Sequence, residues 1–131
     1  MAKVVVRKSD AEGAYTGTAG DFTLEIDKEK GLPRSIDLVL LGLGSCTIGT
    51  IAPYLRRKGL PADAVHVELS AQFDEATGAY RDLVVELRFL DSVPPETRKI
   101  IASIARTCRI HRTLGSSPDI AIKLADPVPA Q

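Results

Sequence analysis

The sequence predicts an α+β fold with one antiparallel sheet, organised as a single domain over residues 1–131. Two observations indicate this class. Short stretches that alternate apolar and polar residues follow one another along the chain, which is typical of antiparallel strands. Two longer segments instead carry apolar residues at helical spacing. The resulting order βββ-α-ββ-α-β groups strands with strands, as α+β domains do.

The N-terminal quarter is expected to form three short strands. Val4 to Lys8 and Tyr15 to Thr18 are joined by a turn at residues 9–13, and Phe22 to Ile26 follows with regular alternation. In this third strand Phe22, Leu24 and Ile26 point to one face, because successive strand side chains alternate between faces. A polar loop, Asp27 to Pro33, ends this group of strands.

A long helix is predicted next. Ser35 is a plausible N-cap, and Asp37 suits the positive end of the helix dipole in the first turn. Gly59 and Pro61 are expected to end the helix near Lys58, and Pro53 to kink it. The helix is apolar nearly all round, so a small domain can hardly cover it and a partner subunit is expected.

The same helix has a stripe of small side chains. Gly42, Cys46, Gly49 and Pro53 share one face at about 100° per residue. Glycine inside a helix costs about 1 kcal/mol relative to alanine, so repeated glycines indicate a close contact in the core or across an interface. A membrane span is disfavoured, although Ile36 to Leu55 is long enough, because it contains a charge, several hydroxyl residues and a proline.

The second half is expected to form a hairpin, a helix and a last strand. Val65 to Phe73 alternates, with Val65, Val67, Leu69, Ala71 and Phe73 facing inward. A turn leads to the partner strand, Asp82 to Leu90. The second helix begins at Pro94-Pro95, and its buried stripe comprises Ile100, Ile101, Ile104, Ala105 and Cys108. Asp119 to Leu124 is the predicted last strand.

Composition excludes several function classes. The chain has 17 basic residues (Lys and Arg) and 17 acidic ones (Asp and Glu). It therefore lacks the basic excess that would indicate binding to nucleic acid or to an anionic membrane. The N-terminus lacks the pattern of a signal peptide, and we expect a cytoplasmic protein. There, the two cysteines are expected to be free, catalytic or metal-bound rather than a permanent disulfide. Composition alone also permits two buried cysteines with no chemical role.

The stretch GLGSCTIGT, residues 42–50, imitates nucleotide-binding loops without matching them. Gly44 and Gly49 have the spacing of a phosphate-binding loop, but the lysine before Thr50 is absent. A dinucleotide motif fails as well, because Thr47 occupies the place of its third glycine. The glycines are better explained by helix packing.

Two motifs together resemble the OsmC/Ohr family, the osmotically inducible protein C and organic hydroperoxide resistance proteins. One is SIDLVLLGLGSCTIGTIAPYLRRKGL, residues 35–60, in which an acidic residue opens an apolar helix that contains a cysteine. The other is ARTCRIHRTL, residues 105–114, in which a cysteine ends an amphipathic helix and a short helical turn follows. The two cysteines lie about 60 residues apart, and the strand order fits over nearly the whole chain.

The resemblance implies an OsmC-like fold, an intertwined homodimer with antiparallel sheets wrapped around long central helices. It implies a thiol-dependent peroxidase that reduces organic hydroperoxides, with Cys46 as the attacking thiol and Cys108 as the resolving thiol. No metal or organic cofactor is implied, but a dithiol reductant of the lipoyl or thioredoxin type is. A sulfenic acid that condenses with a second thiol fits a chain with two cysteines.

The chain departs from the family at the groups that lower the thiol pKa. The organic hydroperoxide resistance branch has a Glu ten residues before the helix cysteine, where this chain has Ile36; Asp37 follows. Asp37 lies on the opposite face of the helix from Cys46, so its expected role is at the helix N-terminus. The family Arg has no clear counterpart, since Arg7, Arg109 and Arg112 are all candidates.

Two other interpretations use the same residues. Cys46, Cys108, His66 and His111 could form a zinc site, but structural zinc sites usually contain two close ligand pairs and only one is present. The other alternative is a non-catalytic dimer of the same fold that binds an apolar ligand at the subunit interface.

Overall fold

The structure is a computed structural model, and it describes residues 2–10, 12–27, 29–31 and 33–129. It confirms a mixed α+β fold with antiparallel sheets. The elements in chain order are β1 (Val5–Lys8), β2 (Ala14–Ala19), β3 (Phe22–Asp27), α1 (Ser35–Arg57), the 3₁₀ turn η1 (Ala62–Ala64), β4 (Val65–Asp74), β5 (Ala79–Phe89), α2 (Pro95–Ala105) and α3 (Arg109–Gly115). The turn expected at 9–13 and the loop at 27–33 include Ala11, Lys28 and Leu32, which lie outside the described residues.

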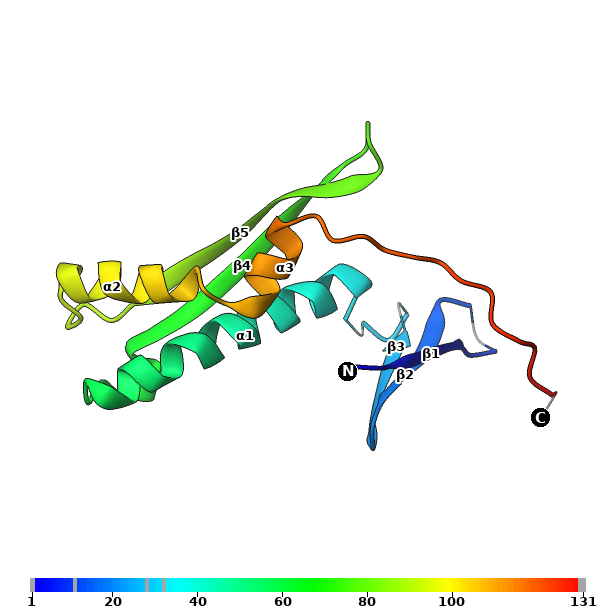
Figure 1. The fold of residues 1–131 in the computed structure, drawn as a ribbon, viewed down its shortest axis with the longest axis horizontal. Coiled ribbons are helices and arrows are strands. Elements are labelled where there is room, and N and C mark those ends of the chain that lie inside the picture. The colour runs from blue at the N-terminus through cyan, green and yellow to red at the C-terminus, as the bar shows by residue number, and fades with distance from the viewer. Residues whose placement is uncertain (1, 11, 28, 32, 130–131) are drawn as a thin grey trace.

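The expectation of one sheet is wrong, because the strands form two. β1, β2 and β3 make a three-stranded antiparallel sheet, and β4 and β5 make a two-stranded one. The first sheet lies beyond the N-terminal end of α1, away from the β4–β5 hairpin (Figure 1). Among the described residues, no strand of the first sheet pairs with β4 or β5.

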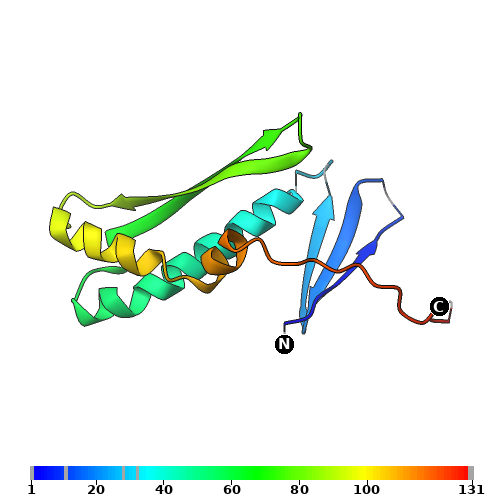
Figure 2. The same cartoon turned by 45° about the horizontal axis from the view of Figure 1, so that its top comes forward.

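The core lies where the helices cover the hairpin. α1 packs against β4, α2 and α3, and the four elements run side by side (Figures 1 and 2). Buried apolar side chains from α1, η1, β4 and α2 meet there, because each element turns one apolar stripe inward. This core cluster comprises Ile51, Tyr54, Leu55, Ala64, Val65, Val93 and Ile101.

The N-cap of helix α1 lies one residue earlier than expected. Arg34, not Ser35, is the N-cap residue, and its backbone N–H donates to the Asp37 carboxylate at 2.9 Å. Asp37 therefore satisfies a backbone donor at the helix start, as its position predicted. At the other end Gly59 adopts a φ of 65°, a left-handed conformation that ends the helix easily only at glycine.

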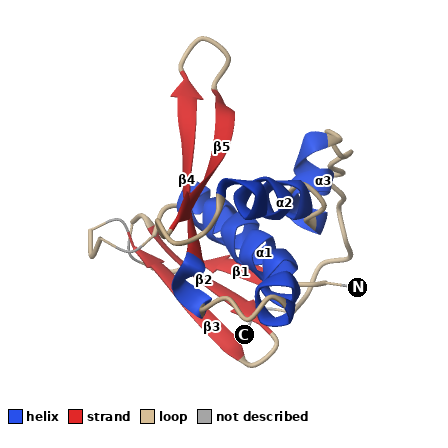
Figure 3. Ribbon diagram, turned by 90° about the vertical axis from the view of Figure 1, so that its left-hand side faces the viewer, coloured by secondary structure: helices blue, strands red, loops and turns tan. Residues whose placement is uncertain are grey.

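The β4–β5 hairpin extends past the helices at its turn (Figure 3). Val65 is buried, and Val67 and Leu69 are half-buried, as the alternation predicted. Phe73 was expected inside but is 49% exposed. The pairing register shifts between Ser70 and Gln72, and beyond this irregularity no helix covers the strand. Phe73 packs edge-on against Tyr80 instead, with ring centroids 5.3 Å apart.

The second helix is shorter than its apolar pattern, which runs to Cys108, predicts. α2 ends at Ala105, and Cys108 is the N-cap residue of α3 instead of the last residue of α2. Ile101 is fully buried and Ile104 packs on the core, but Ile100 is 47% exposed. The inward stripe is therefore narrower than predicted, because only one side of α2 faces α1.

The predicted last strand is not formed. Residues 117–129 belong to no helix or strand, and they run past the three-stranded sheet (Figure 1). Ile120, Ile122 and Leu124 are 88%, 96% and 101% exposed. The alternation is real, but within the described chain no strand edge pairs with this segment.

The small-residue stripe of α1 does not lie in the core. A Cβ at Gly42 or Gly49 would meet no atom within 4 Å, and Pro53 is exposed. The close approach inside the chain occurs at Gly44, where a Cβ would lie 2.8 Å from Cδ1 of Leu69 on β4. Close packing against Gly42 and Gly49 within one chain is therefore excluded for the described residues, and contact across an interface stays a prediction.

One helix is long and apolar enough to span a bilayer by length and composition alone. It is α1, with a mean hydropathy of 1.7 in its most apolar window, a third of which is buried in this structure. Core helices pass the same test, and α1 is the element on which β4, α2 and α3 pack. Its composition is therefore weak support for a membrane location.

Candidate functional site

The two cysteines meet where α1 passes the start of α3. Cys46 lies in the middle of α1, and Cys108 precedes the first residue of α3. The loop after α2 turns back onto α1, and α3 then packs along it. The structure thus brings together two residues that lie far apart in the sequence.

The two thiols differ in their access to solvent. Both are free in this structure; Cys46 is half-buried, whereas Cys108 is completely buried. Cys46 therefore keeps part of its surface open to solvent within one chain, whereas Cys108 has none.

The surroundings of Cys46 favour its thiolate. Hydrogen bonding from the Cys108 thiol is the largest cause that lowers the pKa of Cys46, followed by the backbone N–H of Ile110. Partial burial raises the pKa, but the backbone N–H of Arg109 and the hydroxyl of Thr50 lower it further. The net pKa lies below the ordinary thiol value, and a thiolate is the nucleophilic form of cysteine.

Three of these donors were not singled out from the sequence. Thr50 follows Cys46 by one helical turn, so its spacing could have indicated a neighbour of the thiol. The single hydrogen of its hydroxyl donates to the Cys46 carbonyl at 2.8 Å, and Thr50 is accordingly the smallest of the causes that lower the pKa of Cys46. The backbone N–H groups of Arg109 and Ile110 had no signal in the sequence, because any residue there supplies them.

No side chain of a candidate arginine is a cause of the lowered pKa of Cys46 among the described residues. Arg7 lies on β1, in the separate sheet, and Arg109 acts through its backbone N–H. Asp37 pairs with Arg34, whose guanidinium donates to it at 3.1 and 3.2 Å, and this pairing lowers the pKa of Asp37. Hydrogen-bond donors, rather than a cation, thus stabilise the thiolate within one chain.

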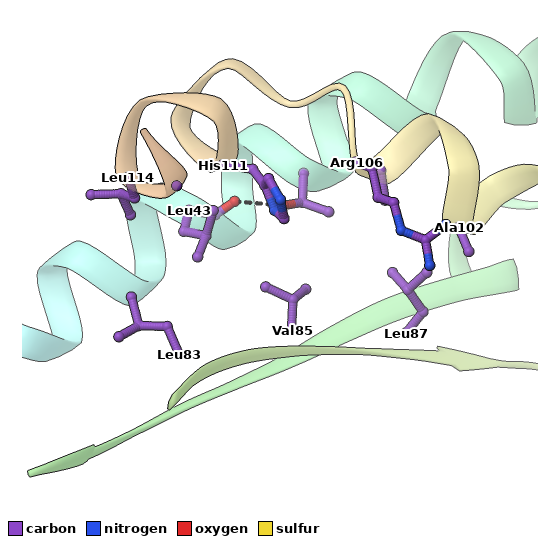
Figure 4. Close-up of a pocket in the computed structure, with 11 residues that line it drawn as sticks. Leu43, Leu83, Val85, Leu87, Ala102, Arg106, His111 and Leu114 are labelled. Atoms are coloured by element: carbon purple, nitrogen blue, oxygen red, sulfur yellow. Dashed lines mark hydrogen bonds between the residues drawn. The ribbon is translucent and has the colours of Figure 1, made fainter. Parts of the chain in front are cut away.

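A pocket of about 400 Å³ lies between α1, β5, α2 and α3. Figure 4 shows Arg106 and His111 beside the leucine and valine side chains that form most of its wall. Thr47 also contributes, although its hydroxyl donates to the Leu43 carbonyl at 2.8 Å. Neither cysteine lines this pocket.

The zinc interpretation finds no support in the donor geometry. Across the described ranges, no three His, Cys, Asp or Glu side chains gather closely enough to hold a metal ion. His66 is exposed on β4, and its Nε2 lies 3.3 Å from the Glu68 carboxylate. The two thiols therefore form a pair without the further ligands of a structural zinc site.

Comparison with known structures gives the same fold three times. An OsmC-like protein from Mycoplasma pneumoniae has a TM-score of 0.73 at 13% identity, covering 89% of each chain. A protein of Psychrobacter arcticus, described as an osmotic stress induced and detoxification response protein, has a TM-score of 0.63 at 16% identity, covering 86% of this chain and 85% of its own. The organic hydroperoxide resistance protein OhrB of Bacillus subtilis has a TM-score of 0.61 at 15% identity, covering 89% of this chain and 92% of its own.

Sequence comparison adds the family. No curated protein matches the chain. However, the family model described as OsmC-like protein matches residues 27–123, which include α1, α2, α3 and both cysteines. The chain therefore belongs to the OsmC-like family.

Proposed function

We propose that this protein is a thiol-dependent peroxidase that reduces organic hydroperoxides, in defence against oxidative stress. The observation that carries the proposal is the paired site. A half-buried thiol of lowered pKa faces a second, fully buried thiol that donates to it. A protein fold can bury two unrelated cysteines, but it has no structural need to stabilise one of them as the thiolate.

The proposed reaction uses the two thiols in turn. The Cys46 thiolate attacks the distal oxygen of the hydroperoxide, the O–O bond breaks, and the alkoxide takes up a proton to leave as an alcohol. Cys46 is then a sulfenic acid. The Cys108 sulfur attacks it, water leaves, and a disulfide remains. An external dithiol, of the lipoyl or thioredoxin type, reduces the disulfide by exchange and is itself oxidised.

The assignment of roles rests on exposure and hydrogen bonding. Cys46 is the thiol that a hydroperoxide can reach, and its thiolate accepts the hydrogen bonds. Cys108 is assigned the resolving role because it is completely buried and its hydrogen bond lowers the pKa of Cys46. Disulfide formation requires the two Cα atoms to come within about 7 Å, and Cys108 lies between two helices, where the backbone can adjust.

A homodimer is part of the proposal. The small-residue stripe lies on an open face of α1. Three of its four residues, Gly42, Gly49 and Pro53, are exposed, and Cys46 is half-buried. Val39 continues this stripe and is 43% exposed, and the apolar C-terminal segment lies uncovered as well. A second copy that covered α1 would shelter Cys46 and complete an interface that one chain leaves open.

We further place the protein in the cytoplasm, where a disulfide formed in each cycle is reduced again. The chemistry uses no metal or organic cofactor. The alternative is a non-catalytic dimer that binds an apolar ligand at the subunit interface, and the uncovered apolar surface of α1 is the observation that favours it.

A reaction screen separates the two functions. The reduced protein is mixed with tert-butyl hydroperoxide, a fatty-acid hydroperoxide or H₂O₂, in the presence of dihydrolipoamide or reduced thioredoxin. The peroxidase proposal predicts catalytic consumption, fastest with an organic hydroperoxide, and loss of both free thiols when the reductant is omitted. Thiols that react no faster than free cysteine would reject the peroxidase and leave the binding function.

A further inference from the structure

The pocket between α1, β5, α2 and α3 has a composition that the thiol chemistry does not explain. Its wall is aliphatic, and Arg106 and His111 are its basic residues. Its volume of about 400 Å³ falls in the range of small-molecule sites, which is roughly 300–1,000 Å³. The lining residues are Leu43, Thr47, Leu83, Val85, Leu87, Ala102, Ala105, Arg106, His111, Leu114 and Gly115.

The pocket carries basic side chains without acidic ones, and Arg106 and His111 are both exposed to solvent. No acidic side chain lines it, and Arg106 makes no ion pair or hydrogen bond through its guanidinium within the described part of the chain. Figure 4 shows the Arg106 side chain extending from the end of α2 toward Leu87 of β5, with His111 above Val85. A cation held against an aliphatic wall invites an anion whose remaining part is apolar.

We propose that this pocket binds a linear aliphatic monocarboxylate, with the carboxylate on Arg106 and the alkyl chain along Leu83, Val85 and Leu87. The planar guanidinium matches a carboxylate with two parallel N–H···O bonds, and the His111 ring can donate a third. No other arginine or lysine lines the pocket, which favours one negative charge over a phosphate dianion. The wall carries no phenyl or indole ring, so an alkyl chain fits it better than a stacked aromatic ligand.

The site is separate from the two thiols of the proposed peroxidase centre, because neither cysteine lines it. The proposal therefore does not depend on peroxide reduction, and its test uses no peroxide.

The test is a calorimetric titration of the reduced protein with decanoate and with decanol, which has the same chain without the charge. Decanoate is expected to bind more tightly. Arg106→Gln should weaken decanoate by about tenfold or more, the typical worth of a charge-assisted hydrogen bond, and leave decanol nearly unchanged. Arg112→Gln is the matched control, because Arg112 lies on α3 but does not line the pocket.

A second variant tests the apolar wall. Ala102→Leu narrows the pocket and should weaken both ligands, with amide NMR spectra checking that the fold is kept. Cys46→Ser should bind decanoate as the parent does, which separates this site from the thiols. Equal binding of decanoate and decanol, an equal loss in Arg106→Gln and Arg112→Gln, or no binding by the parent would each overturn the proposal.

Discussion

Two regions of the chain differ in how well they cover their own apolar residues. The helix-hairpin unit, formed by α1, β4, β5, α2 and α3, has a core in which Ile51 and Ile101 are completely buried. The outlying segments, β1–β3 and residues 117–129, leave Val6, Phe22 and Ile122 mostly exposed. The first region holds the thiol pair, and it buries its apolar residues within one chain. The second has strand-like patterns without a layer to pack against, which one chain cannot explain.

The largest expected effect is on dimerisation, and it comes from placing charges in the C-terminal segment. Ile120→Asp combined with Ile122→Asp should weaken dimerisation by at least about 100-fold, because burying each isoleucine contributes about 1.5–3 kcal/mol. Light scattering across micromolar concentrations measures this. Lys123→Glu, which lies on the alternate face of the same segment, is the control and should dimerise like the parent. A parent protein that is monomeric at these concentrations would contradict the dimer itself.

Substitutions at two glycines of α1 distinguish an effect on folding stability from an effect on dimer assembly. Gly44→Leu should lower the free energy of unfolding by about 1–3 kcal/mol, because its side chain would overpack Leu69. Gly42→Leu has open space in its own chain and should weaken the dimer instead. Urea unfolding and light scattering on both variants distinguish the effects. If Gly42→Leu assembles like the parent, the small-residue stripe is not an interface.

Removing the donors to Cys46 should slow its reaction with iodoacetamide near neutral pH. The donors lower the pKa, so losing one raises the pKa and leaves less thiolate at pH 7. Cys108→Ala removes the largest cause and should shift the alkylation profile to higher pH by more than Thr50→Val does. Ser103→Ala, on α2, is the control, because Ser103 is exposed and is not among the causes that lower the pKa of Cys46. A profile that does not move in Cys108→Ala would contradict thiolate stabilisation by the second thiol.

The smallest effect is expected at the start of α1. Pairing with Arg34 lowers the pKa of Asp37, so its stabilisation is complete above the ordinary carboxyl pKa and is lost as pH falls through the lowered value. Asp37→Asn should therefore melt below the parent at pH 7, and the difference should shrink in acid. Asp119→Asn, in the outlying C-terminal segment, should show no such pH dependence.

The comparison of regions also marks what the sequence could predict. α1, its end at Gly59 and the pairing of β4 with β5 followed from periodicity and turn residues, because these depend on nearby residues. The meeting of Cys46 and Cys108 could be expected from the packing of two apolar helices that each carry a cysteine, and the resemblance to the family gave the same pair. The separate sheet and the unpaired segment at 119–124 were mispredicted. An alternating apolar pattern indicates that a segment packs against something, but it does not identify the element that it packs against.

Within the site, side-chain neighbours were easier to foresee than backbone donors. Thr50 lies one turn from Cys46 in the sequence, whereas the N–H groups of Arg109 and Ile110 depend on how the loop after α2 turns. Likewise, Ile100 and Phe73 have the right pattern for burial, but they lie where no neighbouring element covers them. Local pattern gives the face of an element, and tertiary packing decides whether that face is used.

The most direct test of the central claim is the mass of the intact protein after one equivalent of organic hydroperoxide without reductant. The account predicts one intramolecular disulfide between Cys46 and Cys108 in the parent, a sulfenic acid trapped on Cys46 in Cys108→Ser, and unreacted Cys108 in Cys46→Ser. A Cys46→Ser protein that still reacts while Cys108→Ser does not would reverse the roles. A parent whose two thiols stay reduced would contradict the claim.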